Sequence, residues 1–128
     1  MSDFNTQHNR AVWFDIPVGD LARATRFYAA MLAVRVDLQD FGGLKFSVLE
    51  HQDGNGGCLV ERPGEVTSDR GVLLYLNVSG RIRDAVARAG ALGGRVIEPV
   101  TSLGPHGFRA IVVDSEGNRV ALHSQSDA

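Results

Sequence analysis

The sequence predicts an α+β domain made of two βαβββ modules, and a weak internal repeat is the main observation behind this prediction. Ala11–Val18 (AVWFDIPV) is similar to Gly71–Val78 (GVLLYLNV), sixty positions later. Farther along, Gly43–Glu50 (GLKFSVLE) is similar to Gly107–Asp114 (GFRAIVVD). Because these similarities follow the same order in both halves, we interpret the chain as a duplicated unit.

Each half is expected to contain a strand, a helix and three further strands. In module one, about 10–62, these elements are Ala11–Ile16, Asp20–Leu32, Val34–Leu38, Leu44–Glu50 and Gly57–Glu61. In module two, about 71–124, they are Val72–Val78, Arg81–Leu92, Arg95–Glu98, Phe108–Val113 and Arg119–Ser124. A linker at about 62–70 joins the two modules within one domain spanning 1–128.

Local patterns support each of these elements. The first strands are apolar at alternating positions, as half-buried strands are. Asp20 is a suitable N-cap for the first helix, and Gly93 with Gly94 ends the second. The turns Asp53–Gly57 and Ser115–Asn118 are rich in Gly, Asn, Asp and Ser, which favours hairpins between the last two strands of each module.

Composition bounds the function. The chain has 128 residues, 44% of them hydrophobic and 22% charged, which suits one globular domain. A net charge of −2 provides no basic field for nucleic acid or an anionic membrane. The polar N-terminus, Met1–Arg10, and a single cysteine, Cys58, favour a cytoplasmic protein without disulfides.

Strand alternation predicts which side chains meet the helices. The sets Val12, Phe14, Ile16; Val72, Leu74, Leu76; Leu44, Phe46, Val48; Phe108, Ala110, Val112; and Val120, Leu122 are expected on the helix side. On the opposite face we expect a ligand-binding set: Trp13, Lys45, Ser47, Leu73, Tyr75, Asn77, Arg109 and Ala121. Because large apolar groups such as Trp13 are costly to expose, a cavity is favoured over a bare surface.

Several polar residues on that face have two interpretations. Asp15 and His123 are candidates for a general base and a general acid. In the second interpretation, Asp15 only forms an ion pair across the sheet, and His123 is an ordinary histidine of the cavity wall or the surface. Lys45 and Arg109 occupy matching repeat positions and would together hold an anionic ligand, or else they are solvated strand charges.

Three motifs carry a family resemblance. The strand WFDIPV followed by GDLARATRFYAAML, and the ending EGNRVALHS, resemble the vicinal oxygen chelate superfamily, which includes glyoxalase I, bleomycin-resistance proteins and extradiol dioxygenases. The resemblance covers about Arg10 to Ser124. It implies an incompletely closed, eight-stranded, barrel-like sheet around a cavity, with the helices outside. It also implies a homodimer.

The resemblance also implies four metal-ligand positions. They correspond here to Trp13, Leu73 and Ala121, with Cys58 as the approximate fourth. Indole and aliphatic side chains do not coordinate divalent cations, and one cysteine does not make a site. We therefore expect no metal or other cofactor.

These features predict a small-molecule-binding protein with a metal-free cavity. Its expected ligand is an organic molecule that is anionic or aromatic. The alternative is a glyoxalase-like lyase or isomerase that acts on a small carbonyl compound with Asp15 and His123. A third possibility is a scaffold with a vestigial cavity. Turnover, saturable binding without turnover, and absence of binding distinguish the three, since fold alone does not.

Overall fold

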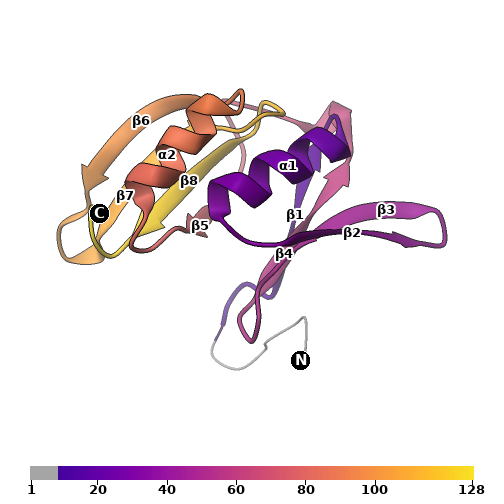
Figure 1. Cartoon of the computed structure of the whole chain (residues 1–128), viewed down its shortest axis with the longest axis horizontal. Coiled ribbons are helices and arrows are strands. Elements are labelled where there is room, and N and C mark those ends of the chain that lie inside the picture. Colours follow the sequence, from indigo (N-terminus) through magenta and orange to yellow (C-terminus); the bar gives the residue numbers. More distant parts are fainter. Residues whose placement is uncertain (1–8) are drawn as a thin grey trace.

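In the computed structural model of the protein, residues 9–128 are described, so most of the polar N-terminal segment lies outside the described residues. Figure 1 shows ten main elements in two groups. Module one contains β1 (Trp13–Val18), α1 (Leu21–Leu32), β2 (Val36–Phe41), β3 (Leu44–Leu49) and β4 (Gly56–Glu61). Module two contains β5 (Tyr75–Asn77), α2 (Ile82–Ala91), β6 (Arg95–Ser102), β7 (Phe108–Val113) and β8 (Arg119–Ser124).

The two modules have the same topology. The strand orders are β1-β4-β3-β2 and β5-β8-β7-β6, with the first and last strand of each module parallel and the remaining neighbours antiparallel. The predicted α+β fold of two βαβββ modules is therefore confirmed. Its eight strands form two separate four-stranded sheets, which do not close into a barrel.

Both helices lie on the same side of the sheets and pack against each other (Figure 1). The buried faces of α1 and α2 join the inner residues of β1, β4, β5, β7 and β8 in one apolar cluster. In α1 this cluster includes Phe27, Tyr28 and Met31, and in α2 it includes Ile82 and Ala85. One core therefore serves both modules. No helix among residues 9–128 is long and apolar enough to span a membrane.

A polar contact fastens the β7–β8 turn of module two to the start of α1. The buried carboxylate of Glu116 accepts hydrogen bonds from the amides of Gly19 (2.9 Å) and Asp20 (2.8 Å). It also pairs with the guanidinium of Arg23 at 2.7 Å. The negative charge therefore meets the free amides at the positive end of the helix dipole.

Two details of the sequence prediction are wrong. β5 contains three residues instead of seven, because the chain pairs with β8 only from Tyr75 onward, and Val72 is 94% exposed instead of meeting the helix. In β3 the faces are reversed. Ser47 and Leu49 are buried on the helix side, where the Ser47 hydroxyl lies 2.8 Å from that of Thr25.

Candidate functional site

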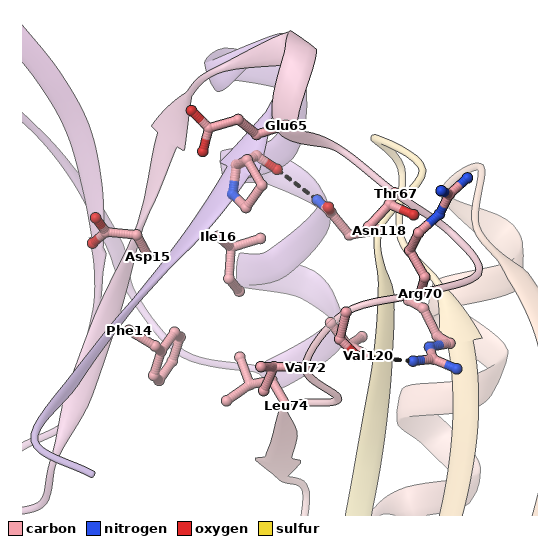
Figure 2. Close-up of a pocket in the computed structure, with 13 residues that line it drawn as sticks. Phe14, Asp15, Ile16, Glu65, Thr67, Arg70, Val72, Leu74, Asn118 and Val120 are labelled. Carbon is pink, nitrogen blue, oxygen red and sulfur yellow. Dashed lines mark hydrogen bonds between the residues drawn. The ribbon is translucent and has the colours of Figure 1, made fainter.

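A hollow of about 330 Å³ lies at the junction of the two modules. Figure 2 shows β1 on one side of it and the linker with β8 on the other. Its apolar walls come from both modules: Phe14, Ile16, Val72, Leu74 and Val120. Phe14 also lines a second hollow of about 320 Å³, which continues toward Tyr75 and Asn77. The first of these spaces is called the junction hollow below.

Polar groups border the junction hollow on the side of module two. The Asn118 side-chain amide donates to the Pro17 carbonyl (2.6 Å), which holds the end of β1 beside the start of β8 (Figure 2). Arg119 donates from Nη2 to the Gly71 carbonyl (3.3 Å). Its Nε is buried and has no hydrogen-bond partner in the structure. The guanidinium of Arg119 therefore has donors to spare beside an apolar space.

Asp15 belongs to the edge of this site and not to its interior. In Figure 2 its carboxylate points away from Ile16 and Val72, on the far side of β1. There the Cys58 thiol donates to the carboxylate at 3.3 Å. Burial, then the hydrogen bond and the charge of Asp15, raise the pKa of Cys58 to about 12. The thiol thus stays protonated at neutral pH, which makes it a poor nucleophile.

Trp13 lies at the start of β1, on the same sheet face as Asp15, and is half-buried. Its ring contacts His51 edge to face, with centroids 6.0 Å apart and an interplanar angle of 88°. The geometry is a favourable aromatic contact. Trp13 is therefore part of an aromatic pair outside the junction hollow, because it is absent from the residues that line that space.

The opposite sheet contributes a polar cluster on its helix-free face. Arg109 forms an ion pair with Glu98 (Nε to Oε1, 2.8 Å) and donates to the Tyr75 hydroxyl (2.7 Å). The hydrogen bonds with Glu98 and Tyr75 raise the pKa of Arg109 above its ordinary value. The cation is permanent, but the carboxylate of Glu98 already offsets its charge.

His123 pairs in register with both Arg109 and Asn77, next to this cluster. Its Nε2 is 2.7 Å from the His106 carbonyl oxygen. A carbonyl only accepts hydrogen bonds, so Nε2 carries a proton and Nδ1 is the remaining ring nitrogen. Ala121 lies beside Tyr75 in the register and is fully buried.

The structure therefore divides the predicted site residues into three groups. Tyr75, Asn77, Arg109, Ala121 and His123 share the helix-free face of module two. Trp13 and Asp15 lie in the other sheet, and Leu73 precedes β5. Lys45 and Ser47 are on the helix side of β3, because the strand packs Ser47 and Leu49 inward. Lys45 and Arg109 consequently do not form one anion site.

Sequence reasoning missed two side chains that matter here, Arg119 and Glu98. Arg119 is two positions before Ala121, and strand alternation places both on the same face. Glu98 was the last residue of its predicted strand, whereas β6 continues to Ser102 and brings Glu98 opposite Ile111. A search of the predicted face for charged residues would have found Arg119, but only the longer strand reveals Glu98.

The side chains at the inferred metal-ligand positions do not fit a divalent cation. Trp13, Leu73 and Ala121 offer no metal-ligating atom, and Cys58 alone does not make a site. Over residues 9–128, no group of three or more His, Cys, Asp or Glu side chains is arranged to hold a metal ion. The residues at these positions therefore do not supply the metal ligands that a metal-dependent lyase needs.

Comparison with known proteins agrees with the module architecture and the motifs. The profile of a family described as the glyoxalase-like domain matches residues 11–123. The chain belongs to the glyoxalase-like domain family. This confirms the resemblance to the vicinal oxygen chelate superfamily. No curated protein matches this glyoxalase-like domain significantly.

Solved structures share the fold of this glyoxalase-like domain at low sequence identity. A glyoxalase/bleomycin resistance protein from Albidiferax ferrireducens T118 has a TM-score of 0.72 and 15% identity, over 91% of this chain and 98% of that one. The fosfomycin resistance protein FosX from Listeria monocytogenes has a TM-score of 0.68 and 15% identity, over 91% and 90%. A glyoxalase-related enzyme from Fulvimarina pelagi has a TM-score of 0.66 and 20% identity, over 90% and 87%.

Proposed function

We propose that this glyoxalase-like domain binds a small organic molecule in the junction hollow without a bound metal. The observation that carries the proposal is the hollow itself, whose apolar walls come from both modules and whose border carries Arg119. Small-molecule sites typically combine apolar walls with a few placed polar groups. A volume of about 330 Å³ lies within the range of such sites.

Arg119 indicates the chemistry of the ligand. A buried donor without a partner is unfavourable by about 1–3 kcal/mol. An acidic group that reaches this guanidinium would offset part of that cost and form a charge-assisted hydrogen bond. The favoured ligand has an aromatic or aliphatic body against Ile16 and Leu74 and an acidic group toward Arg119.

The alternative, a lyase or isomerase that uses Asp15 and His123, has weaker support. The junction hollow is lined by Asp15 but not by His123, and the carboxylate points away from it. A general acid and a general base must both reach the reacting group. Proton exchange in deuterated water at the carbon beside a substrate carbonyl, lost in Asp15→Asn, would favour this alternative over binding alone.

A fluorescence titration tests the binding proposal. The probe is 8-anilinonaphthalene-1-sulfonate, which joins an aromatic body to an acidic group. We expect saturable binding to the native protein. Val72→Arg should weaken it at least tenfold by filling the mouth of the hollow, and Val72 is exposed enough to tolerate the change. Val96→Arg is the matched control, since Val96 is an exposed valine of β6.

The same titration can contradict the proposal. Equal affinity in Val72→Arg, Val96→Arg and the parent would place the probe elsewhere. Arg119→Gln should lower the affinity for the sulfonate by roughly ten- to a hundredfold, as loss of a charge-assisted hydrogen bond of about 1.5–3 kcal/mol implies. An unchanged affinity would remove Arg119 from the site.

We also propose that the chain forms a homodimer, since dimers with twofold symmetry are the commonest soluble homo-oligomers. The support is the family resemblance together with the exposed apolar side chains of Phe41 (80% exposed) and Leu44 (54%) at the end of the β2–β3 hairpin. Light scattering at micromolar concentration is expected to give twice the chain mass. A stable monomer would contradict this part of the proposal.

A further inference from the structure

A third hollow lies on the helix side of module one, away from the junction. Its volume is about 400 Å³, and it is lined by Leu21, Ala22, Thr25, Leu38, Lys45 and Glu61. It forms because the β2–β3 hairpin extends past the N-terminal start of α1, as Figure 1 shows, so the helix does not cover its outer part. As a result, Leu38 is 62% exposed although it faces the helix side of the sheet.

Lys45 is the only lysine of the chain, whose other twelve basic residues are arginines. Eight of those arginines form ion pairs with carboxylates of described residues, namely Arg23, Arg35, Arg62, Arg70, Arg81, Arg83, Arg88 and Arg109. Lys45 forms none with any described residue. An ammonium group therefore lies at a largely apolar hollow, and no carboxylate among residues 9–128 forms an ion pair with it.

The other polar groups around the hollow already have partners. The Thr25 hydroxyl donates to the Leu21 carbonyl (2.6 Å) and lies 2.8 Å from the Ser47 hydroxyl. The Glu61 carboxylate accepts from the Leu21 amide (3.2 Å), at the positive end of the α1 dipole. These contacts turn the polar atoms of Thr25 and Glu61 toward the protein, so Lys45 is the cation that faces the hollow, with the Glu61 carboxylate held at the start of α1.

We infer that this hollow binds a single-chain amphiphile whose alkyl part lies against Leu21, Ala22 and Leu38 and whose carboxylate pairs with Lys45. Burial of the alkyl chain would remove the exposed surface of Leu38 from water. The carboxylate would supply the anion that Lys45 lacks. The site shares no lining residue with the junction hollow, so it is independent of the function proposed there.

The single lysine permits a selective experiment. Reductive methylation with ¹³C-formaldehyde labels Lys45 and the chain terminus only, and octanoate is then titrated below its micelle concentration while the Lys45 signal is followed. We expect a saturable shift. Lys45→Met, followed through the backbone amides of Leu21 and Leu38, should bind at least tenfold more weakly, whereas Lys45→Arg should stay within about threefold of the parent.

Further variants separate the hollow from the charge. Ala22 is exposed on α1, so Ala22→Phe should fill the hollow without disturbing the core and abolish octanoate binding. Glu61→Gln should strengthen binding two- to threefold, because it removes a nearby negative charge yet keeps an acceptor for the Leu21 amide. Arg95→Met, an exposed charge at the start of β6, is the control and should change nothing.

The remaining comparisons decide between ligand sources. Octanol and octylamine should bind at least tenfold more weakly than octanoate. Vesicles of phosphatidylglycerol and phosphatidylcholine should not sediment the protein, because a hollow of this size accepts one chain and not a membrane surface. Octanoate affinity unaffected by Lys45→Met and Ala22→Phe would overturn the inference. So would vesicle binding in the absence of octanoate binding.

Discussion

At the scale of single residues, Glu116 shows how one charge can hold two modules together. Burial alone would raise the pKa of Glu116, but hydrogen bonds from Arg23, the Asp20 amide, Ser115 and the Gly19 amide outweigh it and lower the pKa from 4.5 to about 2. The carboxylate itself is fully buried, whereas the Arg23 side chain is half exposed. The ion pair is thus only partly shielded from water.

Glu116→Gln should therefore destabilise the protein by about 1–2 kcal/mol at pH 7, less than the full pKa shift implies because Arg23 is solvated. Since the folded-state pKa is depressed, this stabilisation is present above pH 4.5 and is lost as pH falls toward 2. Urea unfolding of parent and variant at pH 7 and pH 3 measures the difference. Glu65→Gln, at an exposed linker position, is the control. A difference that grows toward pH 3 would contradict this account.

The residue scale is also where sequence reasoning was weakest. In β3 both faces carry apolar residues, Phe46 and Val48 on one and Leu49 on the other, so alternation alone did not fix the orientation. The deciding contact joins Ser47 to Thr25 across 22 positions, and it allows a serine to be completely buried. No local pattern reveals such a partner, and the error transferred Lys45 to the wrong face.

At the scale of elements, prediction was more successful. Strand and helix order and the two hairpin turns follow from periodicity and duplication, whereas the parallel pairing of the first and last strand of each module was not predicted. β5 is the exception: an apolar run from Val72 to Val78 is typical of a strand, but only Tyr75–Asn77 pairs with β8. Hydrogen-bond partners, and not hydrophobicity, set the length of that strand, and the unpaired part became one wall of the junction hollow.

The turn between α2 and β6 gives a test at this scale. A Cβ placed on Gly94 would lie 2.7 Å from the carbonyl oxygens of Ala89 and Val113, both of which are backbone atoms that cannot rotate away. Gly94→Ala should cost about 1–3 kcal/mol, as overpacking typically does. Gly64→Ala is the matched control, because a Cβ there meets nothing within 4 Å and the backbone is unstrained. Equal unfolding midpoints in urea would contradict the proposed packing.

At the scale of the whole molecule, the two modules behave as one structural unit. Their helices share a core, and the Tyr28 hydroxyl of α1 donates to the Asp114 carboxylate of module two at 2.6 Å. Both groups are buried. Burial, then the charge of Asp114 and this hydrogen bond, raise the pKa of Tyr28, which keeps it a donor at neutral pH.

Tyr28→Phe removes that donor but retains the ring. Asp114 keeps its bonds from the amides of Glu116 and Asn118, both 2.8 Å, so we expect a loss of about 1.5–3 kcal/mol with no change of fold. Calorimetry should show one transition for parent and variant, with a lower midpoint for the variant. Two separated transitions in the parent would contradict a shared core.

The central claim, that both modules build one ligand site, is tested most directly by amide chemical-shift mapping. Uniformly ¹⁵N-labelled protein is titrated with 8-anilinonaphthalene-1-sulfonate, and the perturbed amides are located in the fold. Saturable shifts should gather at Ile16 in module one and at Leu74, Arg119 and Val120 in module two, with one common dissociation constant. Shifts confined to a single module, or spread over the β2–β3 hairpin without saturation, would show that the junction hollow is not the binding site.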